Sequence, residues 1–380
     1  MQTFRVLTVV GARPQFIKAS VVSQAMRDWA QGWICEIMLH TGQHYDFEMS
    51  QVFFDGLKLD EPDIHLECGG GSHAEQTAKM IVGIDEAVSS RHPHAIMVYG
   101  DTNSTLAGAL VAAKRNIPLI HVEAGCRSFN RTMPEETNRI VADSLSKVLL
   151  CASSVDMENL QREGIGIGKS VAGLHLVGDV MYDLAKRTSE EIAEEPAILE
   201  KLGLEPGSYL YTTVHRSENT DDAKRLEEIF AGLTGLVDRG LPVVLPLHPR
   251  TKKMLETYFG GLPNLKGLHL IEPVSYLTSI GLVKYSKAVL TDSGGLQKEA
   301  YYLGKYCVTL RDETEWTQLV DAGLNSLSGA DRGRIIEEAQ KAVGKDWPEK
   351  VPGLYGGGIA GPYLVEAIVN ELCAIYGEST

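Results

Sequence analysis

Carboxylates gather at places in the first half of the chain where a predicted strand ends or a predicted helix begins. Asp101 and Glu123 each follow a short apolar run, and Glu135 and Glu136 open a predicted helix. Each of them alone could cap a helix or complement its dipole. Carboxylates that converge in a cleft have perturbed pKa values and suit proton transfer. The pattern therefore favours general acid–base chemistry.

Two cations accompany these carboxylates near the N-terminus. The apolar run 4–10 leads into a turn that carries Arg13, and Lys18 follows one turn into the predicted helix. Cations at a helix N-terminus oppose the helix dipole, so an anionic ligand explains them better than a solvated surface turn. The turn has only Gly11 and lacks the second and third glycines of a dinucleotide-binding fingerprint.

The second half supplies groups that suit a phosphate. His215 and Arg216 end a predicted strand, and Ser293-Gly294-Gly295 joins another strand to a helix. Ser293 can cap that helix, and the backbone N–H groups of the two glycines are free to hold an anion. Glu299, one to two turns later, can accept both hydroxyls of a ribose. An ordinary capped helix is the alternative, but with His215 and Arg13 the pattern favours a diphosphate.

Alternating strands and helices in both halves predict the elements that place these side chains. Such alternation is typical of parallel sheets covered by helices, so the expected fold is α/β with two Rossmann-like, doubly wound domains facing a central cleft. A chain of 380 residues also exceeds the roughly 250–300 residues that one core supports. The expected domains are 1–172 and 173–360, with a C-terminal helix, 361–380, returning to the first domain.

Composition and spacing argue against several other classes of protein. The net charge of −14 disfavours a nucleic-acid binder, and no apolar run reaches the roughly 20 residues of a membrane span. The N-terminal run reads as a strand and not as a signal peptide, so a cytoplasmic location is expected. The six cysteines have no C-x-x-C spacing, which predicts no metal site. Gly164–Gly168 follows a helix and is interpreted as a loop.

Taken together, the motifs resemble the non-hydrolysing UDP-N-acetylglucosamine 2-epimerases. The resemblance implies a glycosyltransferase-B arrangement, a homodimer, a UDP-linked 2-acetamido sugar as ligand, and no metal or redox cofactor. It also implies a role in surface polysaccharide synthesis. The matching segments occur in order along almost the whole chain: Gly11–Lys18, Gly42–His44, Gly100–Thr102, His121–Arg127, Pro134–Arg139, His215–Asn219 and Asp292–Glu299.

The resemblance also implies a role for each matching residue. In the reaction it implies, the C2 proton is removed while UDP leaves C1, and UDP then adds back to a glycal-like intermediate with protonation of the opposite face. The implied catalytic residues are Asp101, Glu123, Glu135, Lys18 and His215. The implied UDP ligands are Arg13, His215, Ser293, Gly294, Gly295 and Glu299.

Two departures from the family pattern lie in segments expected beside the sugar. Trp316 replaces an arginine, and the loop between Arg127 and Pro134 is two residues shorter. Both resemble the branch that acts on UDP-2,3-diacetamido-2,3-dideoxyglucuronic acid, which is favoured here over UDP-N-acetylglucosamine. Arg131, and next Lys18, would hold the sugar carboxylate, and Trp316 would give an acetamido methyl an apolar wall. The alternatives are a solvated Arg131 and a Trp316 that packs at the domain interface.

Other interpretations remain open at this point. The same double fold hosts glycosyltransferases, and a UDP-sugar-binding module without chemistry would need none of the carboxylates. A transferase needs an acceptor groove and usually lacks a cluster of three carboxylates in its first domain. The resemblance does not by itself imply the regulatory UDP-sugar site of some family members, because residues 45–47, which follow Gln43 and His44, differ from the form associated with such a site.

Overall fold

A computed structural model describes residues 3–43, 60–167, 172–192, 197–263, 265–351 and 353–377, with Arg13 described by its backbone only. The chain divides into two compact units, and each contains one parallel sheet. The first unit comprises Met1–Leu184 and Leu354–Thr380, and the second Ala185–Gly353. The expectation of two doubly wound α/β domains is confirmed.

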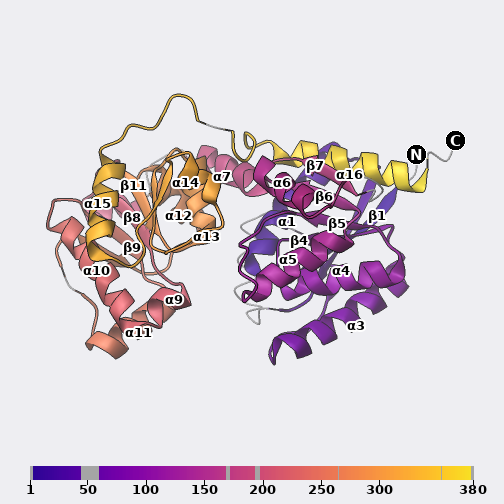
Figure 1. The fold of residues 1–380 in the computed structure, drawn as a ribbon, viewed down its shortest axis with the longest axis horizontal. Helices are drawn as coiled ribbons and strands as arrows, with labels where there is room; N and C mark the ends of the chain where they lie inside the picture. Colours follow the sequence, from indigo (N-terminus) through magenta and orange to yellow (C-terminus); the bar gives the residue numbers. More distant parts are fainter. Residues whose placement is uncertain are drawn as a thin grey trace. The chain divides into compact units, whose positions relative to one another are not determined.

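The first sheet has seven described strands in the order β3-β2-β1-β4-β5-β6-β7, all parallel (Figure 1). The order reverses between β1 and β4, so this is the switch point, where ligands bind in such sheets. The strands are β1 (Phe4–Val10), β2 (Ile34–His40), β3 (Ile64–His65), β4 (Ala95–Tyr99), β5 (Leu119–Val122), β6 (Val148–Cys151) and β7 (Gly173–Leu176).

Helices cover this sheet because their apolar stripes must be buried against it. Met80 and Ile84 of α3 pack in one core with Leu7, Val9 and Leu39 of the sheet, and all five are fully buried. The helices of this unit are α1 (Arg13–Trp29), α3 (His73–Arg91), α4 (Asn103–Arg115), α5 (Pro134–Leu145), α6 (Ser154–Arg162) and α16 (Ala360–Tyr376), while α7 (Val180–Glu191) spans the boundary between the units.

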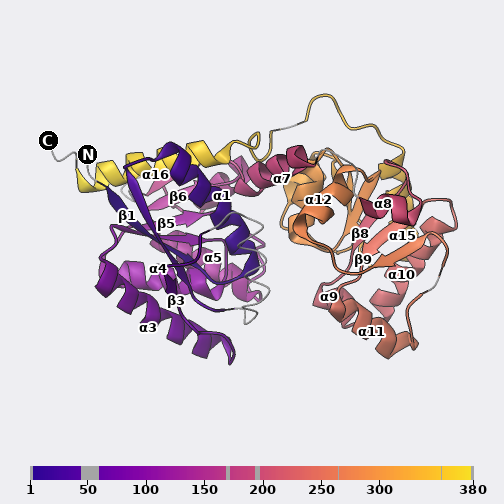
Figure 2. The ribbon, with the colours of Figure 1, turned by 180° about the vertical axis from the view of Figure 1, so that it is seen from behind.

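The limits of the units differ from those expected. Strand β7 pairs with β6 as the last strand of the first sheet, so the first unit continues past residue 172 to Leu184. The returning segment begins at Leu354, ahead of the expected residue 361, because Tyr355 is fully buried and its carbonyl accepts the Asp179 N–H at 3.0 Å. Helix α16 then lies along α1 (Figures 1 and 2).

The second sheet has six described strands in the order β10-β9-β8-β11-β12-β13, again all parallel, with its switch point between β8 and β11. These strands are β8 (Leu210–Thr213), β9 (Val243–Pro246), β10 (Leu268–Ile271), β11 (Ala288–Thr291), β12 (Cys307–Thr309) and β13 (Asn325–Leu327). The helices are α8 (Ala197–Leu202), α9 (Ser217–Thr220), α10 (Ala223–Val237), α11 (Pro249–Phe259), α12 (Tyr276–Lys284), α13 (Gly294–Tyr302), α14 (Thr317–Asp321) and α15 (Arg332–Val343).

Within the described ranges, no helix combines the length and apolar character needed to cross a bilayer. The same ranges contain no group of three or more His, Cys, Asp or Glu side chains arranged to hold a metal ion.

Candidate active site

The turn after β4 brings Asp101 to the switch point of the first sheet. Gly100 has a φ of +57°, a left-handed conformation that glycine adopts without strain. Its N–H donates to the Val122 carbonyl at 3.0 Å. A β-carbon at Gly100 would lie 3.5 Å from both Glu123 Oε2 and Lys18 Nζ. The turn is therefore packed directly against two of the predicted catalytic side chains.

Lys18 and Glu123 form a hydrogen-bonded ion pair, and each side chain is only 14% exposed. Lys18 comes from the second turn of α1, and Glu123 follows β5. Glu123 has a φ of +67°, which is strained for a residue with a side chain. The Glu123 and Ala124 N–H groups both donate to the Leu150 carbonyl at 3.1 Å, and this contact holds the strained backbone in place.

Asp101 is held by Arg139 of α5, a residue that the sequence interpretation did not select as functional. Arg139 Nε and Nη2 both donate to Asp101 Oδ2, at 2.9 and 2.5 Å, and Arg139 Nη1 donates to Glu136 Oε2 at 2.9 Å. Burial alone would lower the pKa of Arg139, but Asp101 and the hydrogen bonds raise it above its usual range. We call Asp101, Glu123, Lys18 and Arg139 the carboxylate cluster.

The two neighbouring glutamates at the start of α5 have different surroundings. Glu135 is exposed, and no described contact joins it to Asp101 or Glu123. Glu136 is 1% exposed and accepts the Ser128 and Phe129 N–H groups at 2.9 and 3.0 Å. Burial would raise the pKa of Glu136, but these bonds and Arg139 lower it. Glu136 thus organises the loop between β5 and α5, whereas the exposed Glu135 is accessible to a ligand.

A buried ion-pair network supports the carboxylate cluster. His121 donates from Nε2 to the Gly100 carbonyl at 2.8 Å and from Nδ1 to Asp143 Oδ1 at 2.6 Å. The Gly100 carbonyl and the Asp143 carboxylate thus hold the ring at both of its nitrogens. Arg127 Nη1 donates to Asp143 Oδ2 at 2.6 Å, and Arg127 also pairs with Glu163. The network fixes the turn that presents Asp101.

In the second unit, Asp292 organises the turn that carries His215. Asp292 is fully buried, and its Oδ2 accepts the His215 and Arg216 N–H groups at 2.9 and 3.0 Å. His215 Nδ1 lies 3.2 Å from Asp292 Oδ1. Burial lowers the pKa of His215, Asp292 opposes this effect, and Arg216 and His248 add to it. The net lowering favours a neutral ring at neutral pH.

The Ser293-Gly294-Gly295 turn begins α13 and has the features of an anion site, so we call it the anion turn. Ser293 Oγ accepts the Leu296 N–H at 3.5 Å, and Gly295 is exposed, with open space where a β-carbon would stand. A β-carbon at Gly294 would lie 3.6 Å from Arg216 Nη2. Helix N–H groups and a guanidinium therefore meet at one place, as phosphate binding requires.

Glu299 lies further along α13 and is half-buried. Tyr211 of β8 is buried, and burial, opposed by its hydrogen bond with Ser279, raises the tyrosine's pKa to about 12; the charge of Glu299 adds to that rise. Glu299 is therefore near the switch point between β8 and β11, as its expected role in binding a ribose requires.

Trp316 has a different place from the one expected. It is 8% exposed, its Nε1 donates to the Gly294 carbonyl at 2.9 Å, and Lys298 Nζ lies 4.1 Å from the centroid of the ring. The indole is thus a support for the anion turn and not an exposed wall for a sugar. The sequence suggested a wall because an Arg-to-Trp change does not reveal which way the side chain points.

The remaining predicted residues are less constrained. Arg131 is exposed on the loop between β5 and α5. The Arg13 side chain and His44 lie outside the described part of the chain. Gln43 is described, and its Oε1 accepts the Ser104 hydroxyl at 2.9 Å.

The family model described as UDP-N-acetylglucosamine 2-epimerase matches residues 29–369. The chain belongs to this family. A relative from Pseudomonas aeruginosa named UDP-2,3-diacetamido-2,3-dideoxy-D-glucuronate 2-epimerase is 45% identical over 96% of this chain and 99% of its own. The relatives are named epimerases, so the predicted enzyme class, an isomerase, is confirmed.

Solved structures of this epimerase family share the fold. The Methanocaldococcus jannaschii UDP-GlcNAc 2-epimerase, solved in complex with UDP-GlcNAc and UDP, is 35% identical, with a TM-score of 0.83 over 99% of this chain and 100% of that chain. Phytolacca americana UGT2, complexed with UDP-2fluoro-glucose and pterostilbene, is 13% identical with a TM-score of 0.59 over 100% and 96% of the two chains. The second likeness shows the fold alone.

Proposed function

We propose that this epimerase inverts C2 of a UDP-linked 2-acetamido sugar, with UDP-2,3-diacetamido-2,3-dideoxyglucuronic acid as its preferred substrate. The observation that carries the proposal is the 45% identity, over nearly the full length of both chains, to the relative named for that substrate. UDP-N-acetylglucosamine is the alternative substrate, since the family model and other relatives bear its name. The cytoplasmic location, the homodimer and the role in surface polysaccharide synthesis stay predictions.

The proposed chemistry divides between the two units. Asp101, Glu123 and Glu135 move protons at the two faces of C2, and Lys18, which pairs with Glu123, holds negative charge on the sugar. His215, Ser293 and the two glycines of the anion turn hold the departing diphosphate, with Glu299 on the ribose. Because the C2 proton is not acidic, stabilisation of the leaving UDP has to supply much of the rate enhancement.

A competition between the two UDP-sugars tests the substrate. We expect a higher kcat/KM for the uronate, because its carboxylate needs a cation or several N–H donors when it is desolvated. Arg131→Ala should lower kcat/KM for the uronate by roughly 10–100-fold, as expected for one charged hydrogen bond, and spare UDP-N-acetylglucosamine. The matched control is Arg162→Ala, which removes an exposed arginine of α6 paired only with Glu158 within the described contacts.

A preference of the wild-type enzyme for UDP-N-acetylglucosamine would refute the uronate assignment and leave the reaction type standing. If the uronate is preferred but Arg131→Ala keeps that preference, another group holds the carboxylate, and Lys18 is the next residue to replace.

A further inference from the structure

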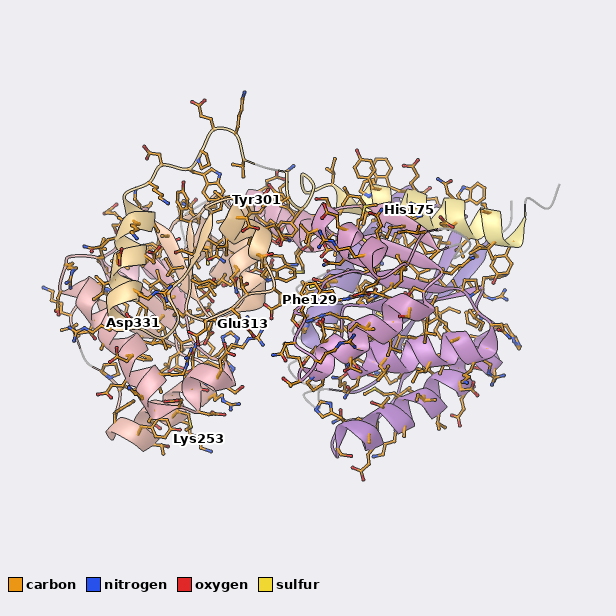
Figure 3. The ribbon with its side chains drawn as sticks, in the orientation of Figure 1. Phe129, His175, Lys253, Tyr301, Glu313 and Asp331 are labelled. Carbon is orange, nitrogen blue, oxygen red and sulfur yellow. The ribbon has the colours of Figure 1, made fainter. Side chains whose placement is uncertain are left out.

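Phe129, on the loop between β5 and α5, combines two features that neither folding nor packing requires. Its φ is +58°, a left-handed conformation that is uncommon and strained for a bulky side chain. Its side chain is 72% exposed and stands at the surface of the first unit (Figure 3). A glycine at this position would relieve the strain, and a polar residue would suit the exposure, so the ring itself calls for an explanation.

The backbone of Phe129 is held firmly in this conformation. Its N–H donates to Glu136 Oε1 at 3.0 Å, and the Ser128 N–H and hydroxyl donate to Glu136 Oε2 at 2.9 and 3.0 Å. Glu136 is 1% exposed, so breaking these bonds would strand a buried carboxylate. The buried acceptor therefore offsets the strain and keeps the ring at a fixed place.

The same glutamate links this loop to the carboxylate cluster. Arg139 Nη1 donates to Glu136 Oε2 at 2.9 Å, and the other end of that guanidinium holds Asp101 Oδ2. Three successive hydrogen bonds thus join the Phe129 backbone to Asp101. The exposed ring is positioned by the same side chains that position a proposed catalytic carboxylate.

We propose that Phe129 packs its ring against an acetamido group of the bound sugar and positions the sugar for the reaction. This inference rests on the proposed function. An acetamido group presents a flat amide and a methyl, which pack well on an aromatic face, whereas the phosphates and the uronate carboxylate do not. Trp316, the residue expected to provide this apolar wall, is buried beneath the anion turn, and Phe129 takes that role.

The test compares Phe129→Gly, Phe129→Ala and Phe129→Tyr for kcat/KM, inhibition by UDP and thermal melting. We expect the glycine and alanine variants to lose about tenfold in kcat/KM, with the inhibition constant of UDP unchanged, and the tyrosine variant to stay near wild type. Relief of the left-handed strain should raise the melting midpoint of the glycine variant by about 2–4 °C. A more stable but less active variant is a result that a purely structural role cannot produce.

His92→Gly is the matched control, because His92 also has a positive φ, +48°, but lies at the C-terminal end of α3. It should raise the melting midpoint without changing kcat/KM. Wild-type kcat/KM in both Phe129→Gly and Phe129→Ala, measured on the sugar that the wild-type enzyme epimerises, would overturn this inference and leave the proposed function intact. Failure of the wild-type enzyme to epimerise either sugar would overturn both.

Discussion

Asp101→Asn is expected to lower kcat by about 10²–10⁴-fold, the range that one general acid or base contributes, while UDP affinity stays near wild type. The asparagine oxygen can still accept from Arg139, which now donates twice to Asp101 Oδ2, so the turn after Gly100 should keep its shape. What is lost is a carboxylate able to take or give a proton. Glu123→Gln should behave in the same way.

Glu158→Gln provides the matched control for these amide substitutions. Glu158 is a half-exposed carboxylate of α6 in the same unit, paired with Arg162 four residues on, and it should leave kcat unchanged. Steady-state epimerisation and UDP inhibition are measured on all three variants. Near wild-type turnover in both Asp101→Asn and Glu123→Gln would show that the carboxylate cluster does not carry out the proton transfers.

Asp143→Ala is expected to destabilise the first unit by about 3–5 kcal/mol, because it strands buried positive charge. The side chains of Asp143 and His121 are fully buried and that of Arg127 is 1% exposed, so water cannot replace the missing carboxylate. Urea unfolding of the full chain measures the loss. Glu163 is the outer partner of the same arginine, and its side chain is 34% exposed. Glu163→Ala should therefore cost only about 0–1 kcal/mol of stability.

The cost of Asp143→Ala should depend on pH. Burial would raise the pKa of Asp143, but the charges and hydrogen bonds of His121 and Arg127 outweigh it and lower the pKa. A lowered pKa in the folded state adds stability above the pKa of the unfolded chain, about 3.9 for aspartate, and that stability is lost as pH falls through the folded-state value. The gap between wild type and Asp143→Ala should therefore be widest near neutral pH and narrow below about pH 4. A gap that widens on acidification would contradict this account.

Periodicity and strand ends were enough to predict the elements that carry the site. The apolar run 4–10 is strand β1, and Asp101 and Glu123 follow strands β4 and β5 as expected. Lys18 and Glu123, 105 positions apart, meet because the carboxyl ends of parallel strands share one edge.

Residues that act through other residues were harder to predict. Arg139 and Asp143 lie on a predicted helix, where an isolated charge is usually solvated, and nothing in their spacing reveals that they face inward. Trp316 shows the reverse problem, because an aromatic that replaces a polar residue can line a ligand or support a turn. The C-terminal segment returns to the first unit earlier than expected. The sequence did not reveal this, because the burial of Tyr355 depends on contacts that are distant in sequence.

Exchange of the C2 proton tests the central claim most directly. The wild-type enzyme is incubated in deuterated water with each UDP-sugar alone, without any acceptor, and deuterium at C2 is followed by NMR alongside formation of the second epimer. We predict that deuterium enters C2 of the preferred sugar as the two epimers interconvert, and that Asp101→Asn slows both processes together. No exchange of either sugar without an acceptor would contradict the account and favour a glycosyltransferase or a UDP-sugar-binding module.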